Sequence, residues 1–449
     1  MKEKTLKLLN LRPGEWRLVL MLWFLLAVNM IVQELSDVVA TAGFVSSIGA
    51  RQVPWLWVVT TVINIFAAAG YGLLVDRFPR LKLITWLLIG LAGFYLSLQV
   101  MFTLGVSDKI TYPSLYILAD QQFGIMPLAF WALANDVYSI SEARRIFPII
   151  ASGAVIGGLA GNGLAAVSGV ILERTGGSPA ILFSITAVLL VGTMALLRLV
   201  FRKRVIRARQ SRDEDNNLRE SITLGIDYFT NVPMLKMAGI AMLCIGVTLT
   251  LVEYHFLQSI EQWVTSDLQF QSFLGIYKAI QMGGLLLFQW LITGRLLQKI
   301  PLKNAFLVLP AALAAAGSVA LGLPGLIGAA ISRFVARTVY VAWDEPARKS
   351  LQGLVPDERR GRISTFMDSY FGAFATLFGC FLLIILLGTV SVGWLGESVI
   401  SYIYLGVALA TAVGSLLAGL RLRKVYDQSL LNWRLARSKR KSVLDGIDF

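Results

Sequence analysis

Residues 147–172 read FPIIASGAVIGGLAGNGLAAVSGVIL, and no Asp, Glu, Lys or Arg interrupts them. About 20 consecutive, mainly apolar residues in an α-helix suffice to cross the lipid core of a membrane. Lipid offers no partners for backbone N–H and C=O groups, so a crossing segment must satisfy its own, as a helix does. This stretch therefore predicts a membrane-spanning helix.

Similar apolar runs recur along the 449 residues of the chain. Hydrophobic residues make up 56% of it and charged residues only 15%, whereas soluble domains are about one quarter charged. We therefore expect an all-α membrane protein with twelve transmembrane helices. The predicted spans are 17–37, 53–75, 82–105, 112–136, 147–172, 179–201, 235–258, 271–296, 302–323, 325–345, 364–389 and 397–420.

Basic residues mark one side of these spans. The loops after the odd-numbered spans hold only Arg51, Lys109 and Arg174, whereas the loops after the even-numbered spans and both chain ends are basic. Because Lys and Arg favour the cytoplasmic side, we predict cytoplasmic termini in a multi-pass protein of the plasma or inner membrane. Orientation and attraction to anionic lipid then explain the net charge of +14 without a nucleic-acid partner.

The longest polar stretch inside the chain divides the spans into six and six. We expect an N-terminal six-helix half at 1–201, a cytoplasmic linker at 202–231, a C-terminal six-helix half at 232–420 and a basic cytoplasmic tail at 421–449. The halves share weak echoes, because the loops after the second and fourth spans of each half are basic and turn-bearing. Two pseudo-symmetric six-span halves are typical of the major facilitator superfamily.

The loop GLLVDRFPRLK at 72–82 resembles that superfamily's signature loop, G-x-L-a-D-r-x-G-r-r. Asp76, Arg77 and Arg80 match the signature, and Pro79 stands where it has glycine. The resemblance implies that these charges form a gating latch between the halves, and a plain cytoplasmic turn is the alternative. The loop after the fourth span supplies further gating candidates, which are Glu142, Arg144 and Arg145.

Small residues are concentrated on spans two, five, eight and eleven, at four-residue spacing on spans five and eight. Span five, for example, has Gly153, Gly157 and Gly161. Small residues let helix backbones approach closely in lipid. In the superfamily these four spans face one another, so we expect close packing there, with incidental use of Gly and Ala as the alternative.

Ionisable residues inside the spans are few, and each is a functional candidate because a charge in the bilayer is costly. Arg333 and Arg337 in span ten and Lys278 in span eight are expected to bind an anionic group of a substrate, since arginine's fork matches carboxylate and phosphate. Helical spacing places Tyr340 and Asp344 on the same face as the two arginines. The alternative is that these charges only pair with one another and hold helices together.

Span four carries a similar stripe, in which Asp120, Trp131 and Asn135 are substrate-binding candidates. Acids near the other cations would balance charge or carry a proton, and a histidine titrates near neutral pH. The coupling candidates are Glu34, Asp37, Glu253 and His255; Asp368 is a further charge at the start of span eleven. In the superfamily, spans one, four, seven and ten line the central cavity, and most of these residues lie on them.

The stretch FWALANDVYSISEARRIFP at 130–148, which runs into GAVIG at 153–157, resembles the ATP/ADP translocase (nucleotide transporter) family. This family lies within or beside the major facilitator superfamily. The resemblance is firm over about residues 30–165 and faint in the second half. It departs at Ser36, where the family commonly has an arginine before Asp37, and the missing cation weakens the case for ATP or ADP. The matching positions are Trp131, Asn135, Glu142, Arg144, Arg145 and Gly153.

The leading hypothesis is a secondary transporter that works by alternating access and moves an anionic metabolite, with nucleotides among the candidates, by exchange or proton coupling. Two alternatives stay open: a non-transporting module that binds lipid or a partner protein, and a lipid-handling carrier of the same fold. The sequence has no metal-ligand cluster, G-x-S-x-G elbow or Walker A motif, so we expect no enzyme, cofactor or metal. The expected partners are a small anionic substrate and anionic lipid, and a monomer is the simplest state.

Overall fold

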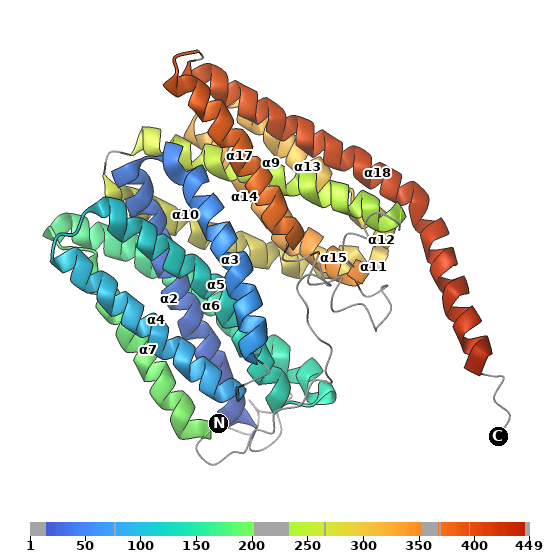
Figure 1. Ribbon diagram of the computed structural model, residues 1–449, viewed down its shortest axis with the longest axis horizontal. Coiled ribbons are helices and arrows are strands. Elements are labelled where there is room, and N and C mark those ends of the chain that lie inside the picture. Colours follow the sequence, from blue (N-terminus) through green and yellow to red (C-terminus); the bar gives the residue numbers. More distant parts are fainter. Residues whose placement is uncertain are drawn as a thin grey trace. The chain divides into compact units, whose positions relative to one another are not determined.

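A computed structural model describes residues 15–75, 78–201, 233–264, 266–352, 367, 370–394 and 396–444. Every regular element in these residues is a helix (Figure 1). Eleven of these helices are long and apolar enough to cross a membrane. The all-helical membrane architecture is therefore confirmed. The count of twelve stays a prediction, because the segment predicted as span eight is not among the eleven.

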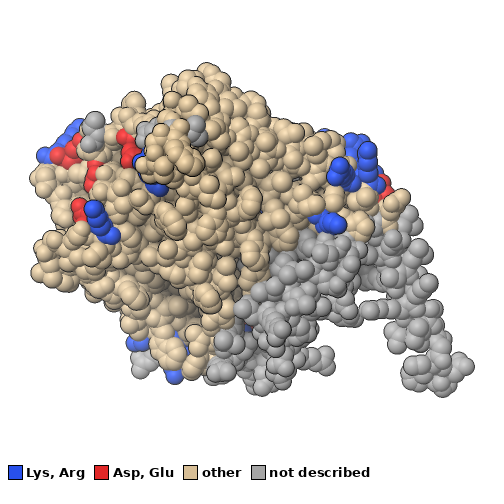
Figure 2. Space-filling model, turned by 45° about the horizontal axis from the view of Figure 1, so that its top comes forward, with Lys and Arg blue, Asp and Glu red and all other residues tan. Residues whose placement is uncertain are grey.

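The surface of the described residues suits a lipid environment. Large apolar side chains are widely exposed, including Phe66, Val188, Trp290 and Ile385, each more than two-thirds exposed. On the face shown in Figure 2, a broad uncharged surface separates groups of Lys, Arg, Asp and Glu that gather toward its margins. Soluble proteins rarely expose apolar surface on this scale, so this surface is typical of a protein surrounded by lipid.

The helices form two compact units. The first comprises the described parts of residues 1–215 together with 260–283, and the second those of 216–259 together with 284–449. The predicted boundaries of the two halves remain predictions. The helices of the first unit are α2 (Trp16–Ile48), α3 (Val53–Val75), α4 (Arg80–Thr103), α5 (Asp108–Val137), α6 (Ile140–Thr175), α7 (Ala180–Phe201), a short 3-10 turn, η1 (Ala50–Gln52), and most of α10 (Asp267–Phe288).

Helix α2 is the centre of the first unit, packing against α5 and α6. The glycines of α6 make this contact close. A methyl group at Gly153 would meet the carbonyl oxygen of Trp23 at 2.5 Å, and one at Gly161 would meet that of Ile31 at 2.6 Å. This stripe packs closely, as predicted, but the predicted partner is wrong: among the described residues, the stripe contacts span one and not spans two, eight or eleven. Span eight approaches α6 through Gly275, where a methyl group would meet the carbonyl oxygen of Asn162 at 2.8 Å.

In the second unit, α13 packs against α14 and α18, and α17 packs against α18. Helix α18 extends as one helix well past the others of its unit (Figure 1). Its side chains beyond residue 428 lie outside the described part, so a basic tail along the membrane stays a prediction. The helices of this unit are α9 (Pro233–Trp263), α11 (Gly294–Lys299), α12 (Leu302–Ala305), α13 (Val308–Gly322), α14 (Leu326–Val339), α15 (Glu345–Gln352), α17 (Phe371–Ser391) and α18 (Glu397–Leu444).

Five-residue π-helical turns occur at two places among the described residues of the second unit. The segment η2 (Gln289–Thr293) follows α10, and η3 (Tyr340–Asp344) follows α14. They are joined by a hydrogen bond in which the Thr293 hydroxyl donates to the carbonyl oxygen of Ala342 at 2.8 Å. A π-turn alters the regular helical hydrogen bonding, and such turns are frequent at functional sites. The bond shows that a side chain of one turn satisfies a backbone group of the other.

Candidate functional site

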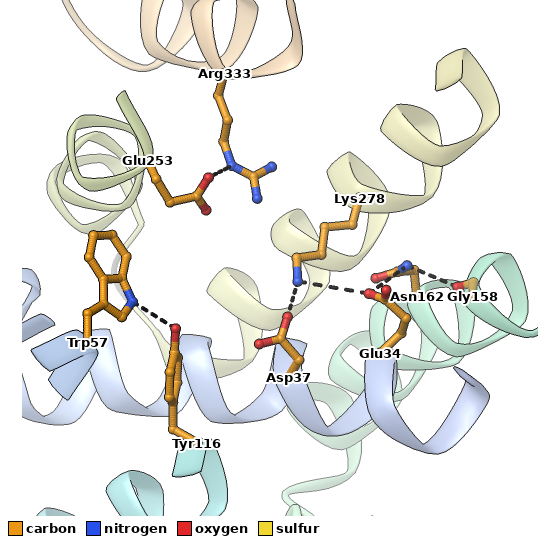
Figure 3. A network of polar contacts seen from close by, with 9 residues as sticks. All are labelled: Glu34, Asp37, Trp57, Tyr116, Gly158, Asn162, Glu253, Lys278 and Arg333. Atoms are coloured by element: carbon orange, nitrogen blue, oxygen red, sulfur yellow. Dashed lines mark hydrogen bonds and ion pairs between the residues drawn. The ribbon is translucent and has the colours of Figure 1, made fainter. Parts of the chain in front are cut away.

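Lys278 lies at the centre of a partly buried charge cluster in the first unit (Figure 3). Its ammonium group forms an ion pair with Asp37, and its Nζ lies 3.9 Å from a carboxylate oxygen of Glu34. Asn162 completes the cluster, since its Nδ2 donates to Glu34 at 3.2 Å and to the carbonyl of Gly158 at 2.9 Å. The residues come from α2, α6 and α10, which the glycine contacts hold together.

We call Lys278, Glu34, Asp37 and Asn162 the Lys278 cluster. Its formal charges do not sum to zero. One ammonium group faces two carboxylates, and the side chains of Lys278 and Glu34 are only 16% exposed. Within the cluster, two carboxylates share one cation. The cluster is less suited to binding an anion, because its cation is already neutralised.

Arg333 is paired inside the second unit. Its Nε lies 2.7 Å from Glu253, and its guanidinium lies 4.6 Å from the ring centroid of Phe256. The Arg333 side chain is 7% exposed, whereas that of Glu253 is 31% exposed. This geometry fits the alternative in which intramembrane charges hold helices together. It also leaves part of the carboxylate accessible.

Arg337, one turn further along α14, is in a different environment. It is exposed, and its guanidinium lies 5.9 Å from the ring centroid of Tyr340. No carboxylate of the described residues forms an ion pair with it. Arg337 also lies near the middle of the candidate span Leu326–Ser350. Within the described part of the chain, it is thus a cation without a carboxylate partner in a candidate membrane span.

The helical face predicted to carry Tyr340 and Asp344 beyond Arg337 is interrupted by the π-turn η3. The spacing rule that groups Arg333 with Asp344 assumes a regular α-helix, but α14 ends at Val339. The buried carboxylate of Asp344 pairs with Arg348 at 2.7 Å, and Arg348 donates to the Tyr340 hydroxyl at 3.2 Å. Arg348 is therefore a site residue that the spacing rule missed.

The candidates on α5 occupy two environments. The carboxylate of Asp120 accepts a hydrogen bond from Nδ2 of Asn64 on α3 at 2.6 Å. Trp131 instead packs against Phe130 and Phe147, with ring centroids 5.1 and 5.2 Å away, while Asn135 is exposed. Asp120 is therefore held by an amide, and Trp131 belongs to an aromatic group.

His255 is buried in the second unit, where its Nδ1 lies 2.8 Å from the hydroxyl of Tyr404. That hydroxyl donates its proton to Oε1 of Gln258 at 2.7 Å. The hydroxyl has only one proton, so Nδ1 must donate to it, and the neutral ring then has a bare Nε2. This nitrogen is buried and has no hydrogen-bond partner in the described part of the chain.

Of the gating candidates, Asp76, Arg77 and the side chain of Arg144 lie outside the described residues. Asp368, the further charge at the start of span eleven, lies outside them too. Arg80 on α4 lies 3.6 Å from Asp136 on α5. Arg145 forms a two-pronged pair with Glu15 at 2.7 and 2.8 Å. Both arginines therefore tie helix ends within the first unit.

Glu142 forms a capping box with Ser139 at the start of α6, accepting from its backbone N–H at 3.0 Å and from its hydroxyl at 2.8 Å. A capping box satisfies backbone N–H groups that the first helical turn leaves without partners. This local contact gives Glu142 a structural task. It leaves the gating role of Glu142 a prediction.

The sequence analysis did not predict several polar residues that take part in these networks. Some are acids near span ends, and the others are neutral amides, which are harder to recognise in an apolar run than a charged residue. A buried amide can still be recognised as a candidate because it needs hydrogen-bond partners. The missed residues are Glu15, Asn64, Gln121, Asp136 and Asn162.

Comparisons with known proteins agree with this architecture. The structure resembles that of the nucleoside transporter NupG, with a TM-score of 0.64, 14% identity, and coverage of 91% of this chain and 99% of that one. It also resembles a bacterial homologue of the lysosomal transporter Spinster in an inward-facing, unoccupied conformation (TM-score 0.60, 15% identity, 94% and 98% coverage). An auto-inhibited POT-family peptide transporter is similar too (TM-score 0.62, 12% identity, 90% and 96% coverage).

These identities are low, so the likeness shows a shared fold and leaves the substrate open. A search of curated proteins found no match. The family model described as TLC ATP/ADP transporter matches residues 94–337, more than half of the chain. The match continues into the second half, where the sequence resemblance is faint. The chain therefore belongs to the TLC ATP/ADP transporter family and is a multi-pass membrane transporter.

Proposed function

We propose that this transporter moves an anionic metabolite, with nucleotides as the first class to test, by alternating access. Membership of a family described as ATP/ADP transporters supports the choice of a small anionic substrate. The proposal includes twelve spans in two six-helix halves, cytoplasmic termini and residence in the plasma or inner membrane. Transport proceeds by exchange or is coupled to protons.

Arg337 is the observation that carries this proposal. A charged side chain that is exposed near the middle of a span does not face hydrocarbon, because the cost is too high. It faces a water-filled cavity or a ligand. Since no acid of the described residues neutralises Arg337, an anionic substrate is the natural counter-charge, and arginine binds carboxylate and phosphate with two parallel hydrogen bonds.

The paired cations have a different task in this proposal. Arg333 and Lys278 already contact carboxylates, so a substrate anion must compete with those acids for them. Competition of this kind lets substrate binding change the state of an acid, which is what coupling requires. We assign proton or charge coupling to Glu34 and Asp37 beside Lys278, and to Glu253 beside Arg333, with the bare Nε2 of His255 as a further acceptor.

Reconstitution into liposomes tests the proposal. Uptake of labelled nucleotides and organic anions is measured with and without unlabelled anion inside, which separates exchange from net uptake. Arg337→Ala is expected to abolish substrate-dependent flux, and Arg337→Lys to retain a fraction of it because the charge remains. Lys303→Ala is the matched control, since that cation of the same unit pairs with the exposed Asp427.

Two results would overturn the proposal. One is the absence of substrate-dependent flux across a broad panel of anions for folded wild-type protein. The other is full activity of Arg337→Ala, which would show that this cation contributes nothing to substrate binding.

A further inference from the structure

A hydrogen-bond network of amide and carboxyl side chains joins α3 to α5 in the first unit. Gln121 donates through Nε2 to Oδ1 of Asn64 at 2.8 Å, and Asn64 donates through Nδ2 to the carboxylate of Asp120 at 2.6 Å. Both hydrogen bonds run from Gln121 through Asn64 to Asp120. One acceptor of this network has no partner: Oε1 of Gln121 is buried without a hydrogen bond in the described part of the protein.

Asp120 lacks the kind of cation partner that accompanies four other acids inside the spans. Glu34 and Asp37 face Lys278, Glu253 faces Arg333, and Asp344 faces Arg348. No Lys or Arg of the described residues forms an ion pair with Asp120. A carboxylate inside a span is costly unless something neutralises it. An amide hydrogen bond orients the carboxylate but supplies no positive charge.

The available ligand atoms define the kind of cation that fits. They are the carboxylate of Asp120 and the amide oxygens of Asn64 and Gln121, and hard cations prefer oxygen ligands. The described residues contain no cluster of three His, Cys, Asp or Glu residues able to hold a metal, and the single negative charge here matches a single positive one. This composition favours a monovalent cation over a divalent or transition metal.

The local backbone also suits such a site. Gly124 lies against Asn64, and a methyl group at this glycine would come within 3.3 Å of Oδ1 of Asn64. Pro127 lies inside α5, and it has no N–H to bond the carbonyl of Phe123, four residues earlier. A side chain at position 124 would therefore crowd the Asn64 amide, and the turn that contains Asp120 has a main-chain oxygen without its usual helical partner.

We propose that Asn64, Asp120 and Gln121 form a binding site for an alkali-metal cation of the Na⁺ class. Rotation of the Gln121 amide brings its oxygen to the ion, and the Asp120 carboxylate neutralises it. The coupling of this ion to substrate movement rests on the proposed function. Binding of the ion does not rest on it, so the two fail separately.

The test measures binding on purified, detergent-solubilised, full-length protein. Thermal unfolding is followed as NaCl replaces choline chloride at constant ionic strength and pH, and ²²Na⁺ binding is measured directly. A ligand that binds the folded state raises the melting temperature in a saturable way. We expect this rise for wild type, at least about a tenfold loss of Na⁺ affinity in Asp120→Asn, and weaker binding in Asn64→Ala and Gln121→Leu.

Asp427→Asn is the matched control, because that exposed acid pairs with Lys303 and its loss should leave the Na⁺ response unchanged. If Asp120→Asn does not fold, Gln121→Leu and ²²Na⁺ binding to wild type decide the question. Equal responses to Na⁺ and choline would overturn the proposal. So would a wild-type Na⁺ response in folded Asp120→Asn, or stabilisation that follows pH alone. Na⁺ binding without anion flux would leave this site standing and refute only the transport function.

Discussion

Gly157 offers a sharp test of how the first unit holds its charges. A methyl group at this position would overlap the carbonyl oxygen of Ala27 and lie 2.9 Å from the Ala27 Cα. These are backbone atoms of α2, which cannot rotate away as a side chain does. Gly163 on the same helix provides the control, since a methyl group there would meet nothing within 4 Å.

The two Gly→Ala substitutions should change stability in opposite directions. Forcing an extra carbon into a close-packed contact costs about 1–3 kcal/mol. At an open helical position, alanine is better than glycine by roughly 0.5–1 kcal/mol because the unfolded chain loses less freedom. Because both positions are helical and share this gain, we expect Gly157→Ala to be less stable than Gly163→Ala by the packing cost of about 1–3 kcal/mol.

Reversible unfolding of the detergent-solubilised protein by titration with a denaturing detergent gives both free energies of unfolding. Anion flux in liposomes provides a second readout, because α2 and α6 supply Glu34 and Asn162 to the Lys278 cluster. Gly157→Ala should reduce flux, and Gly163→Ala should not. If Gly157→Ala proves as stable as Gly163→Ala, the close approach of α6 to α2 is not the constraint that we infer.

Three further substitutions test individual contacts by the same unfolding assay. Glu253→Gln leaves the buried guanidinium of Arg333 without its acid and should cost about 3 kcal/mol, so an unchanged midpoint would show that this pair is not needed. Lys278→Met should cost more alone than in an Asp37→Asn background, with a coupling of about 1 kcal/mol or more, and strictly additive losses would contradict the ion pair. Thr293→Val removes the hydrogen bond between the two π-turns and should cost about 1 kcal/mol; wild-type stability would mean that the accepting carbonyl finds another partner.

Most of the membrane architecture follows from the sequence, because lipid imposes a single solution on a long apolar run. Length and apolarity identify eleven of the spans as helices, and four-residue glycine spacing predicts the close contact of α6. The partner of that contact was harder to predict. A glycine stripe shows that some backbone comes near, but whether it is that of span one or span eight depends on tertiary packing.

The candidate site was predicted in its charges and not in its pairings. Lys278 and Arg333 are evident in the sequence because a cation in an apolar run is rare. Their acids lie far along the chain, and helical spacing relates residues of one helix only. Amides such as Asn162 carry no charge to flag them. From Tyr340 onward, α-helical spacing no longer predicts which residues share a face, because a π-turn replaces the α-helix. No residue type in the sequence indicates that turn.

The distribution of buried charges bears on how a transport cycle could run. The Lys278 cluster closes within the first unit, and the pair of Arg333 with Glu253 closes within the second. Separating a buried pair leaves an uncompensated charge and costs about 3–5 kcal/mol. The pair of Arg333 with Glu253 lies within one of the proposed six-helix halves and can stay together when that half reorients, whereas the Lys278 cluster joins spans one and eight of different proposed halves. Arg337 differs from both, since no acid of the described residues accompanies it. A conformation that buries Arg337 has a lower free energy once an anion is bound to it. An anionic substrate would therefore supply the missing counter-charge. Under the proposed function, this asymmetry favours exchange, in which reorientation waits for an anion, over movement of the empty carrier.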